Sequence, residues 1–179
     1  MKKEHVVYSA IAIILLFAFI YMAIPTNTTK VTLETNKGDI VIELYDSMPI
    51  TTANFIKLVE QGFYDETIFH RIIGNFMIQG GDPQGTGMGG PGYVIKDEFS
   101  KDSKNDRGTI SMANAGPNTG GSQFFINLVD NNLLDSKHPV FGKATPESMK
   151  VIDEIAKVET NANDKPLEDI KILKAYLKE

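Results

Sequence analysis

Two segments of the sequence gather side chains that could bind a peptide and act on it. The first, residues 69–82, sets Arg71 among apolar residues and ends in Gln79-Gly80-Gly81-Asp82. Because Arg is rarely buried without a partner, Arg71 is expected either in an ion pair or at the wall of an apolar pocket. The alternative is an arginine that extends from a sheet edge into water. On one extended strand, Phe69, Arg71 and Ile73 would share a face.

The second segment, residues 111–126, combines small residues with side-chain amides and two adjacent Phe residues. Small residues allow another chain to approach the backbone closely, and Asn114 and Gln123 supply amide donors and acceptors. Ser122 lacks the surrounding pattern of a nucleophile elbow, so a covalent serine mechanism is not expected. Taken alone, the segment could also be a tight turn that leads into a core strand.

Composition excludes several classes of chemistry. The 179 residues include no Cys and only three His, which excludes a thiolate nucleophile, a disulfide framework and a cysteine-ligated metal, and no cofactor is expected. A net charge of −5 argues against nucleic-acid binding. Gly85-x-Gly87-x-x-Gly90 formally matches a dinucleotide fingerprint. Because Pro91-Gly92 would break the helix that this motif requires, a surface loop is predicted there.

The elements that must position these segments are mostly short strands. One helix is predicted after Pro49, ending before Gly62, and a second is predicted to open at Thr145-Pro146-Glu147. Many short strands with two widely separated helices favour a mostly antiparallel barrel or sandwich. The predicted strands are Val31–Thr35, Ile40–Tyr45, Thr67–Ile73, Phe76–Gln79, Thr109–Ala113, Gln123–Leu128, Val140–Lys143 and Lys165–Leu173.

Together the two segments resemble the cyclophilin family of peptidyl-prolyl isomerases. The resemblance extends over about 150 residues, from Lys30 to Glu179, and rests on Phe69-His70-Arg71, Ala113-Asn114-Ala115-Gly116, Ser122-Gln123-Phe124-Phe125 and Leu134-Asp135-x-Lys137-His138. It implies a closed eight-stranded antiparallel β-barrel capped by two α-helices, with an active site on the outer face of the barrel. The implied reaction is the cis–trans isomerisation of Xaa-Pro bonds.

The resemblance also implies a role for individual residues. Arg71 would be the catalytic residue. Gln79, Ala113 and Asn114 would hold the substrate backbone, and His138 would close the edge of a proline pocket. The expected pocket residues are Phe76, Met77, Phe125 and Leu134, and Ala115, Gln123 and Leu133 complete the expected substrate-binding set.

Two positions depart from the family's usual pattern. Leu133 stands where many members carry Trp; Leu offers less surface and no indole donor, which predicts weakened binding of cyclosporin with activity retained. Gly74-Asn75 replaces a frequent Pro-Gly. Because Asn tolerates a positive φ better than most residues, the bend is expected to survive.

The N-terminal segment predicts a membrane helix. Val6–Ile24 is an uncharged run of 19 residues, which as a helix spans roughly 28 Å, close to the thickness of a bilayer core. Lys2 and Lys3 predict a cytoplasmic N-terminus. An uncleaved anchor is favoured over a signal peptide that would release a secreted form, because bulky Tyr21 precedes the best cleavage site. The predicted division is a cytoplasmic N-terminus at 1–5, a transmembrane anchor at 6–24, a linker at 25–30 and the isomerase domain at 31–179.

The leading interpretation is a membrane-anchored isomerase that acts on proline-containing, unfolded or partly folded chains outside the cytoplasm. The alternative is a Pro-peptide-binding chaperone or docking module with incidental turnover. Without Lys2, Lys3 and Glu4 the chain has 16 basic and 22 acidic residues, a net charge of −6, which would disfavour strongly acidic clients. A monomer is the default expectation.

Overall fold

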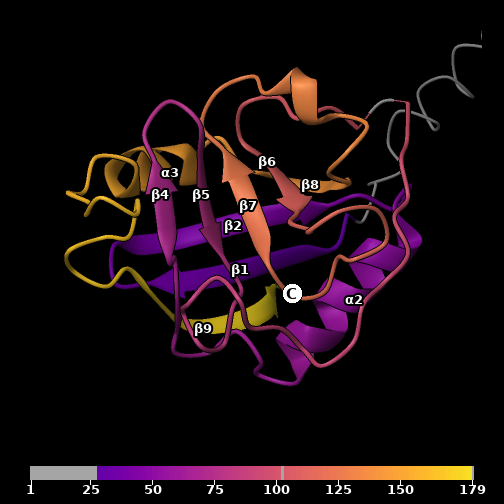
Figure 1. Cartoon of the computed structure of the whole chain (residues 1–179). Helices are drawn as coiled ribbons and strands as arrows, with labels where there is room; N and C mark the ends of the chain where they lie inside the picture. The colour runs from indigo at the N-terminus through magenta and orange to yellow at the C-terminus, as the bar shows by residue number, and fades with distance from the viewer. Residues whose placement is uncertain (1–27, 102, 179) are drawn as a thin grey trace, which may run out of the picture.

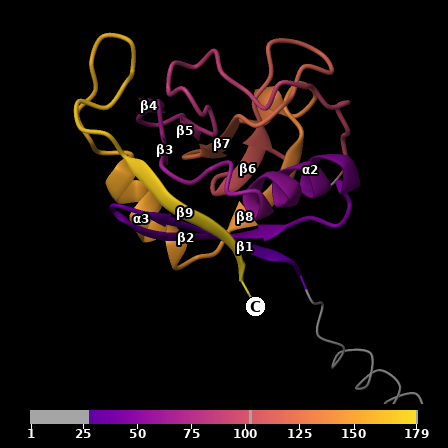
Figure 2. The same ribbon diagram turned by 90° about the horizontal axis from the view of Figure 1, so that it is seen from below.

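Nine short strands form one curled antiparallel sheet in this computed structural model, which describes residues 28–101 and 103–178. The order across the sheet is β3-β9-β1-β2-β8-β6-β7-β5-β4. The strands are β1 (Lys30–Thr35), β2 (Gly38–Leu44), β3 (Thr67–Ile68), β4 (Arg71–Ile73), β5 (Met77–Gly80), β6 (Thr109–Met112), β7 (Phe124–Asn127), β8 (Val140–Ala144) and β9 (Lys171–Lys178). Figures 1 and 2 show that the half formed by β4, β5, β7 and β6 lies across the half formed by β1, β2 and β9.

The sheet is a curled half-barrel, so the prediction of a closed eight-stranded barrel is wrong. The two end strands of the order, β3 and β4, belong to one segment of chain. β3 pairs with β9, whereas β4 pairs with β5, and Phe69 and His70 connect them. The two ends of the sheet are therefore joined by a covalent connection, and no ladder of hydrogen bonds closes it.

This break also overturns the prediction that Phe69 shares a face with Arg71. Phe69 is fully buried and its ring meets that of Phe124 edge-on at 6.1 Å, while Arg71 is exposed. An uninterrupted strand would have put the two side chains on one face. The two irregular residues, Phe69 and His70, shift the alternation, so that the phenylalanine enters the core and the arginine faces outward.

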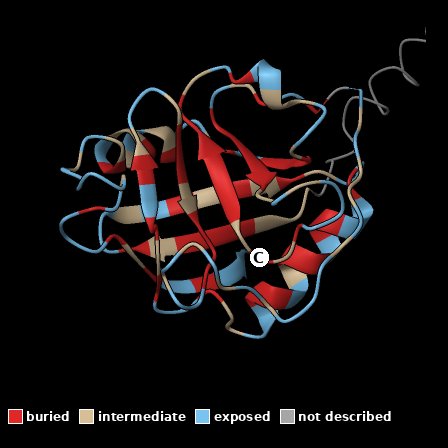
Figure 3. Ribbon diagram, viewed as in Figure 1, coloured by how far each residue is buried: buried red, intermediate tan, exposed pale blue. Residues whose placement is uncertain are grey.

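The inner face of the sheet carries the core. Ile72, Ile78, Ile126 and Ile110 occupy paired positions across β4, β5, β7 and β6, and each is at most 2% exposed. Burial is shown in Figure 3. An aromatic cluster continues this core, in which Phe55 contacts Tyr64, Phe124 and Phe141 at ring-centroid distances of 5.1, 5.6 and 5.1 Å.

Two α-helices lie at opposite ends of the curled sheet (Figure 1), as predicted. Helix α2 (Pro49–Glu60) begins with proline in its first turn, and the Glu98 carboxylate accepts a hydrogen bond from the Thr51 backbone N–H at 2.6 Å. Helix α3 (Ser148–Ile155) is followed by the chain that leads to β9. A short 3-10 helix, η1 (Asn132–Leu134), precedes β8.

Two further predictions have different outcomes. The predicted last strand, Lys165–Leu173, is wrong in its bounds: β9 runs from Lys171 to Lys178, because residues 159–167 form a hydrogen-bonded loop of their own. The predicted membrane helix at 6–24 lies outside the described residues. Within 28–101 and 103–178, no helix combines the length and the apolar character that crossing a bilayer requires.

Candidate active site

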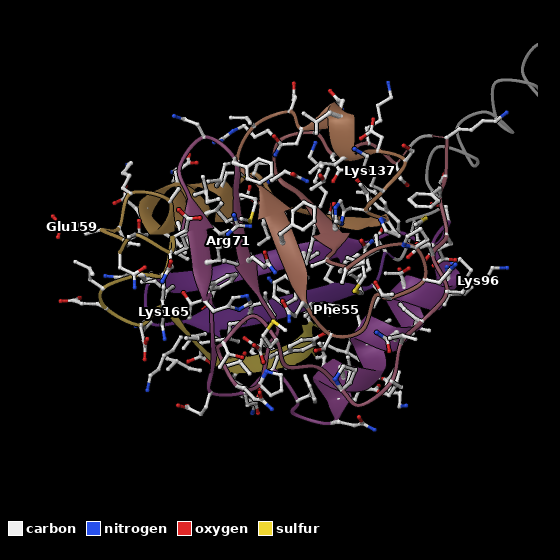
Figure 4. The ribbon with its side chains drawn as sticks, viewed as in Figure 1. Phe55, Arg71, Lys96, Lys137, Glu159 and Lys165 are labelled. Carbon is white, nitrogen blue, oxygen red and sulfur yellow. The ribbon has the colours of Figure 1, made fainter. Side chains whose placement is uncertain are left out.

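The outer face of the same four strands carries the residues expected to do chemistry. Arg71 on β4 pairs with Gln79 on β5, Gln79 pairs with Phe125 on β7, and Phe125 pairs with Ser111 on β6. Paired residues of antiparallel strands lie on the same face. A single row across the sheet therefore brings a cation, an amide and an aromatic ring together. Figure 4 shows Arg71 on its strand within this face.

Arg71 is half exposed and is held at one edge of its guanidinium group. Its Nε lies 3.3 Å from the Oδ2 of Asp164, and the two side chains are 45% and 40% exposed. The backbone carbonyl of Asp164 accepts a hydrogen bond from Ile72 at 2.8 Å, which ties this loop to β4. An exposed pair contributes about 0–1 kcal/mol, so it orients Arg71 more than it stabilises the fold. Among the described residues, none accepts a hydrogen bond from the two terminal guanidinium nitrogens.

The apolar part of the site lies beside this row. Met77 and Phe125 are only 2% and 5% exposed, although they lie on the outer face. The His138 ring covers Phe125 edge-on, with ring centroids 5.3 Å apart, and its Nδ1 lies 3.2 Å from the Met112 carbonyl oxygen. Phe76 and Leu134 are half-buried, whereas Leu133 is 73% exposed.

The bend between β4 and β5 carries Phe76 into this region. Asn75 adopts a φ of 59°, and the Phe76 N–H donates to the Ile73 carbonyl at 3.1 Å. The glycine that the family usually has at this point of the turn would adopt the same left-handed conformation. The prediction that Asn preserves the bend is confirmed.

A buried network of amides holds the η1 segment against the sheet. Asn127, which is fully buried, accepts a hydrogen bond from Asn131 at 2.8 Å, and Asn131 also donates to the Phe76 carbonyl at 2.9 Å. Asn105 donates its backbone N–H to the Asp135 carboxylate at 2.7 Å. Because buried amides are costly to leave unpaired, this network fixes the position of the residues that follow β7. The sequence does not predict this network, because its hydrogen bonds also join residues as distant in the chain as Phe76 and Asn131.

The glycine-rich segment is a loop without a helix, as predicted. Its anchor is Asp82, a fully buried carboxylate that accepts hydrogen bonds from the backbone N–H groups of Gln84, Thr86 and Gly87 at 2.7, 2.9 and 2.6 Å. Desolvation raises the pKa of Asp82, but these backbone donors outweigh it and the pKa is lowered. A Cβ at Gly89 would collide with this carboxylate, so glycine is required there.

Two amides connect this loop to the outer face. Gln79 donates its Nε2–H to the Oε1 of Gln123 at 2.9 Å, and Gln123 donates to the backbone carbonyls of Gly87 and Gly89 at 3.0 and 2.9 Å. They border a hollow of about 700 Å³, here called the amide hollow, whose lining also includes Tyr93. Ala113, Asn114 and Ala115 line the same hollow.

The backbone of Asn114 presents free groups to this hollow. Its side-chain Nδ2 donates to the Lys137 carbonyl at 2.7 Å, and its Oδ1 accepts from the Gly116 N–H at 3.3 Å. Ala113 is fixed through its N–H, which donates to the Gln123 carbonyl at 3.0 Å. In the part of the chain that the structure describes, no hydrogen bond engages the Asn114 backbone N–H or C=O. That peptide unit can therefore pair with a second chain.

A smaller hollow of about 490 Å³, here called the donor-lined hollow, adjoins Arg71. It shares Gln79 and Gly87 with the amide hollow and is otherwise lined by His70, Arg71, Gly85, Thr86, Asn161, Asn163 and Lys165. Neither of the two hollows is lined by Phe76, Met77, Phe125 or Leu134. The predicted set is thus divided: Gln79, Ala113, Asn114, Ala115 and Gln123 line the amide hollow, whereas the four apolar residues lie outside both hollows.

Both histidines of the described residues are buried or half-buried. Desolvation is the main cause that lowers the pKa of His70; Asp82 raises it, and Arg71 and Lys165 lower it. Desolvation also lowers the pKa of His138, against a raising effect of the Met112 carbonyl and Asp97. Both rings are therefore neutral near pH 7. In the described ranges, no group of three or more His, Cys, Asp or Glu side chains is placed to hold a metal ion.

Comparisons with known proteins identify the family and agree with this fold. Residues 30–177 match the family model described as cyclophilin type peptidyl-prolyl cis-trans isomerase/CLD. Peptidyl-prolyl cis-trans isomerase-like 1 of Mus musculus is 48% identical over 162 residues, covering 86% of this chain and 97% of the mouse protein. The protein of the same name from Gibberella zeae is 48% identical over 157 residues, covering 85% and 96%.

Solved structures give the same result. A crystal structure of a cyclophilin type peptidyl-prolyl cis-trans isomerase from Cryptosporidium parvum superposes with a TM-score of 0.82 and 37% identity, covering 85% of this chain and 98% of that one. A second crystal structure of that isomerase, determined in the presence of the dipeptide Ala-Pro, superposes with a TM-score of 0.80 and 38% identity. It covers 84% of this chain and 99% of that one.

The chain belongs to the cyclophilin-type peptidyl-prolyl cis-trans isomerases. It is an enzyme of this class, and its reaction is rotation about the peptide bond that precedes proline.

Proposed function

We propose that the outer face around Arg71 isomerises Xaa-Pro bonds in unfolded or partly folded polypeptides, with Arg71 as the catalytic residue. The observation that carries this proposal is the row formed by Arg71, Gln79 and Phe125, because it sets a half-free guanidinium beside an apolar surface and an open backbone. The C. parvum isomerase crystallised with Ala-Pro supports a proline-containing ligand.

The chemistry follows from the electronic structure of the amide. Rotation about a peptide bond has a barrier of about 18–20 kcal/mol, because resonance ties the nitrogen lone pair to the carbonyl. At the twisted midpoint the lone pair is localised on the proline nitrogen and can accept a hydrogen bond. A guanidinium donor at that point stabilises the transition state more than either planar state. Arg71 suits this role because it stays charged and presents several fixed donors.

The remaining residues confine rotation to one bond. The proline ring lies against the apolar surface of Phe76, Met77, Phe125 and Leu134, with His138 at its edge. Gln79 and the backbone of Ala113 and Asn114 hold the flanking peptide, and Gln123 and Ala115 border the same hollow. One end of the substrate is thus fixed while the other turns. The protein's own groups suffice for this rotation, which makes and breaks no covalent bond.

A comparison of wild type with Arg71→Ala tests catalysis against binding. In an assay of Xaa-Pro isomerisation, wild type is expected to accelerate the reaction and Arg71→Ala to lose most of that acceleration. Peptide binding, measured by NMR titration, should be retained in the variant. Equal rates for wild type, variant and uncatalysed reaction would contradict the catalytic role and favour the alternative, a Pro-peptide-binding chaperone or docking module.

We further propose that this domain acts outside the cytoplasm, tethered by the apolar segment 6–24. The charge-free run of 19 residues and the two preceding lysines support this placement. Uncatalysed isomerisation takes tens to hundreds of seconds, which is slow enough to limit the folding of exported chains. Protease treatment of intact cells is expected to degrade the domain. A domain that is protected in intact cells and degraded only after lysis would contradict the proposal.

A further inference from the structure

The donor-lined hollow beside Arg71 differs in chemistry from the rest of the molecule. Its side chains are Arg71, Lys165, His70, Gln79, Thr86, Asn161 and Asn163, each of which can donate a hydrogen bond. No carboxylate lines it, although the domain has a net charge of −6. This lining therefore combines two cationic side chains with no anionic one.

The nearby carboxylates are already engaged. Asp164 faces the Nε edge of Arg71 and does not line the hollow. Asp82, whose charge acts on His70, is fully buried and accepts three backbone N–H groups within 2.9 Å. Neither carboxylate lines the hollow, and among the described residues no carboxylate pairs with the terminal nitrogens of Arg71 or with the ammonium group of Lys165.

The loop 161–165 is built to present its basic side chain. The Oδ1 of Asn161 accepts the backbone N–H groups of Asn163 and Lys165 at 2.8 and 3.1 Å, which closes a tight turn. Lys165 is exposed, and among the described residues no ion pair or hydrogen bond engages its ammonium group. Figure 4 shows Lys165 on the loop beside β4, the strand that carries Arg71. His70, 7% exposed, also lines the hollow, and its buried Nδ1 has no hydrogen-bond partner in the part of the chain that the structure describes.

We propose that this hollow is a subsite for an anionic side chain of the polypeptide substrate, a carboxylate near the isomerised bond, with Lys165 as the specificity-determining residue. The inference rests on the proposed function, since the hollow matters to turnover only if Arg71 is catalytic. The net negative charge of the domain predicts that acidic clients are disfavoured, whereas this subsite would favour a client with a carboxylate at one position.

The test uses peptides that contain one Ala-Pro bond and a single Glu moved through the positions before and after it, each paired with the Gln counterpart. For one position, wild type is expected to give about two- to fivefold higher kcat/KM with Glu than with Gln at low salt, which is the range of an exposed ion pair. The ratio is expected to approach one at about 1 M salt, where screening extends over ~3 Å. Lys165→Gln should abolish the ratio, and Lys165→Glu should invert it.

Lys174→Glu is the matched control, because Lys174 is exposed on β9 and lines neither hollow. It changes the net charge equally and is expected to keep the wild-type ratio. Equal rates for Glu and Gln at every position in wild type would overturn the subsite, as would a ratio that survives in Lys165→Glu. Acceleration of the Gln peptides by wild type separates this failure from failure of the proposed function, which would abolish turnover of both series.

Discussion

The two faces of the half-sheet formed by β4, β5, β7 and β6 differ in what they require of their residues. The inner face has an isoleucine at each position of one row across the four strands, and each isoleucine is at most 2% exposed. The outer face places a cation, an amide and an aromatic ring at the next paired positions. Because side chains alternate along a strand, neighbours in sequence serve different purposes. Residues for stability and residues for chemistry therefore alternate along the same strands. Substitutions on the inner face should lower stability, and substitutions on the outer face should lower activity.

The largest expected effect is on the inner face. Phe124 meets the rings of Phe55, Tyr64 and Phe69 at 5.6, 5.6 and 6.1 Å and is fully buried. Phe124→Ala should lower the free energy of unfolding by about 3–5 kcal/mol, measured by denaturant titration, because it leaves a cavity. Leu133→Ala, at a residue that is 73% exposed, is the control and should change it by less than about 0.5 kcal/mol. Similar losses for both variants would contradict this picture of the core.

A smaller effect is expected where the glycine-rich loop meets the outer face. Asp82→Ala removes the acceptor of three backbone N–H groups and should cost about 1–3 kcal/mol of unfolding free energy. It should also raise KM, because the Gly87 and Gly89 carbonyls that hold Gln123 belong to the same loop. Asp82→Asn keeps one acceptor oxygen, so its unfolding free energy and its KM should lie between those of wild type and Asp82→Ala. A KM unchanged in Asp82→Ala would show that the loop does not position Gln123.

The pH dependence of stability follows from the buried histidine. The pKa of His70 is lowered in the folded state from 6.5, so the unfolded chain binds a proton more readily. The stability contributed by neutral His70 is complete above pH 6.5 and is lost as the pH falls below that value toward the lowered pKa. Unfolding free energy should therefore decline from pH 7.5 to pH 5.5, and less steeply in His70→Gln. The same slope in both proteins would contradict this assignment.

The smallest effect is expected at the ion pair of Arg71. Asp164→Asn keeps the shape of the side chain and removes its charge, and exposed pairs of this kind contribute about 0–1 kcal/mol. We expect a change in kcat/KM of less than about fivefold, with little change in unfolding free energy. A loss as large as that of Arg71→Ala would mean that the pair, rather than the arginine alone, forms the catalytic unit.

The candidate site residues could be named from the sequence because the resemblance to the cyclophilins rests on short motifs that contain them, such as Phe69-His70-Arg71 and Ala113-Asn114-Ala115-Gly116. Arg71 and Gln79 are close in the chain, and the apolar residues around them mark their strands. The sheet end at Phe69 and His70 could not be predicted, since the change of pairing from β9 to β5 depends on distant strands. Asp164 and Lys165 were missed for the same reason: some 90 residues separate them from Arg71, and only the folded loop brings them together.

The division of roles between the two faces is tested by two variants of adjacent residues, Arg71→Ala on the outer face and Ile72→Val on the inner face. Both kcat/KM and the unfolding free energy are measured on each variant. Arg71→Ala is expected to lower kcat/KM by about 10²–10³-fold and the unfolding free energy by at most about 1 kcal/mol. Ile72→Val should lower the unfolding free energy by about 0.5–1.5 kcal/mol and leave kcat/KM unchanged. A kcat/KM for Arg71→Ala within threefold of that for Ile72→Val would contradict the catalytic role of the outer face.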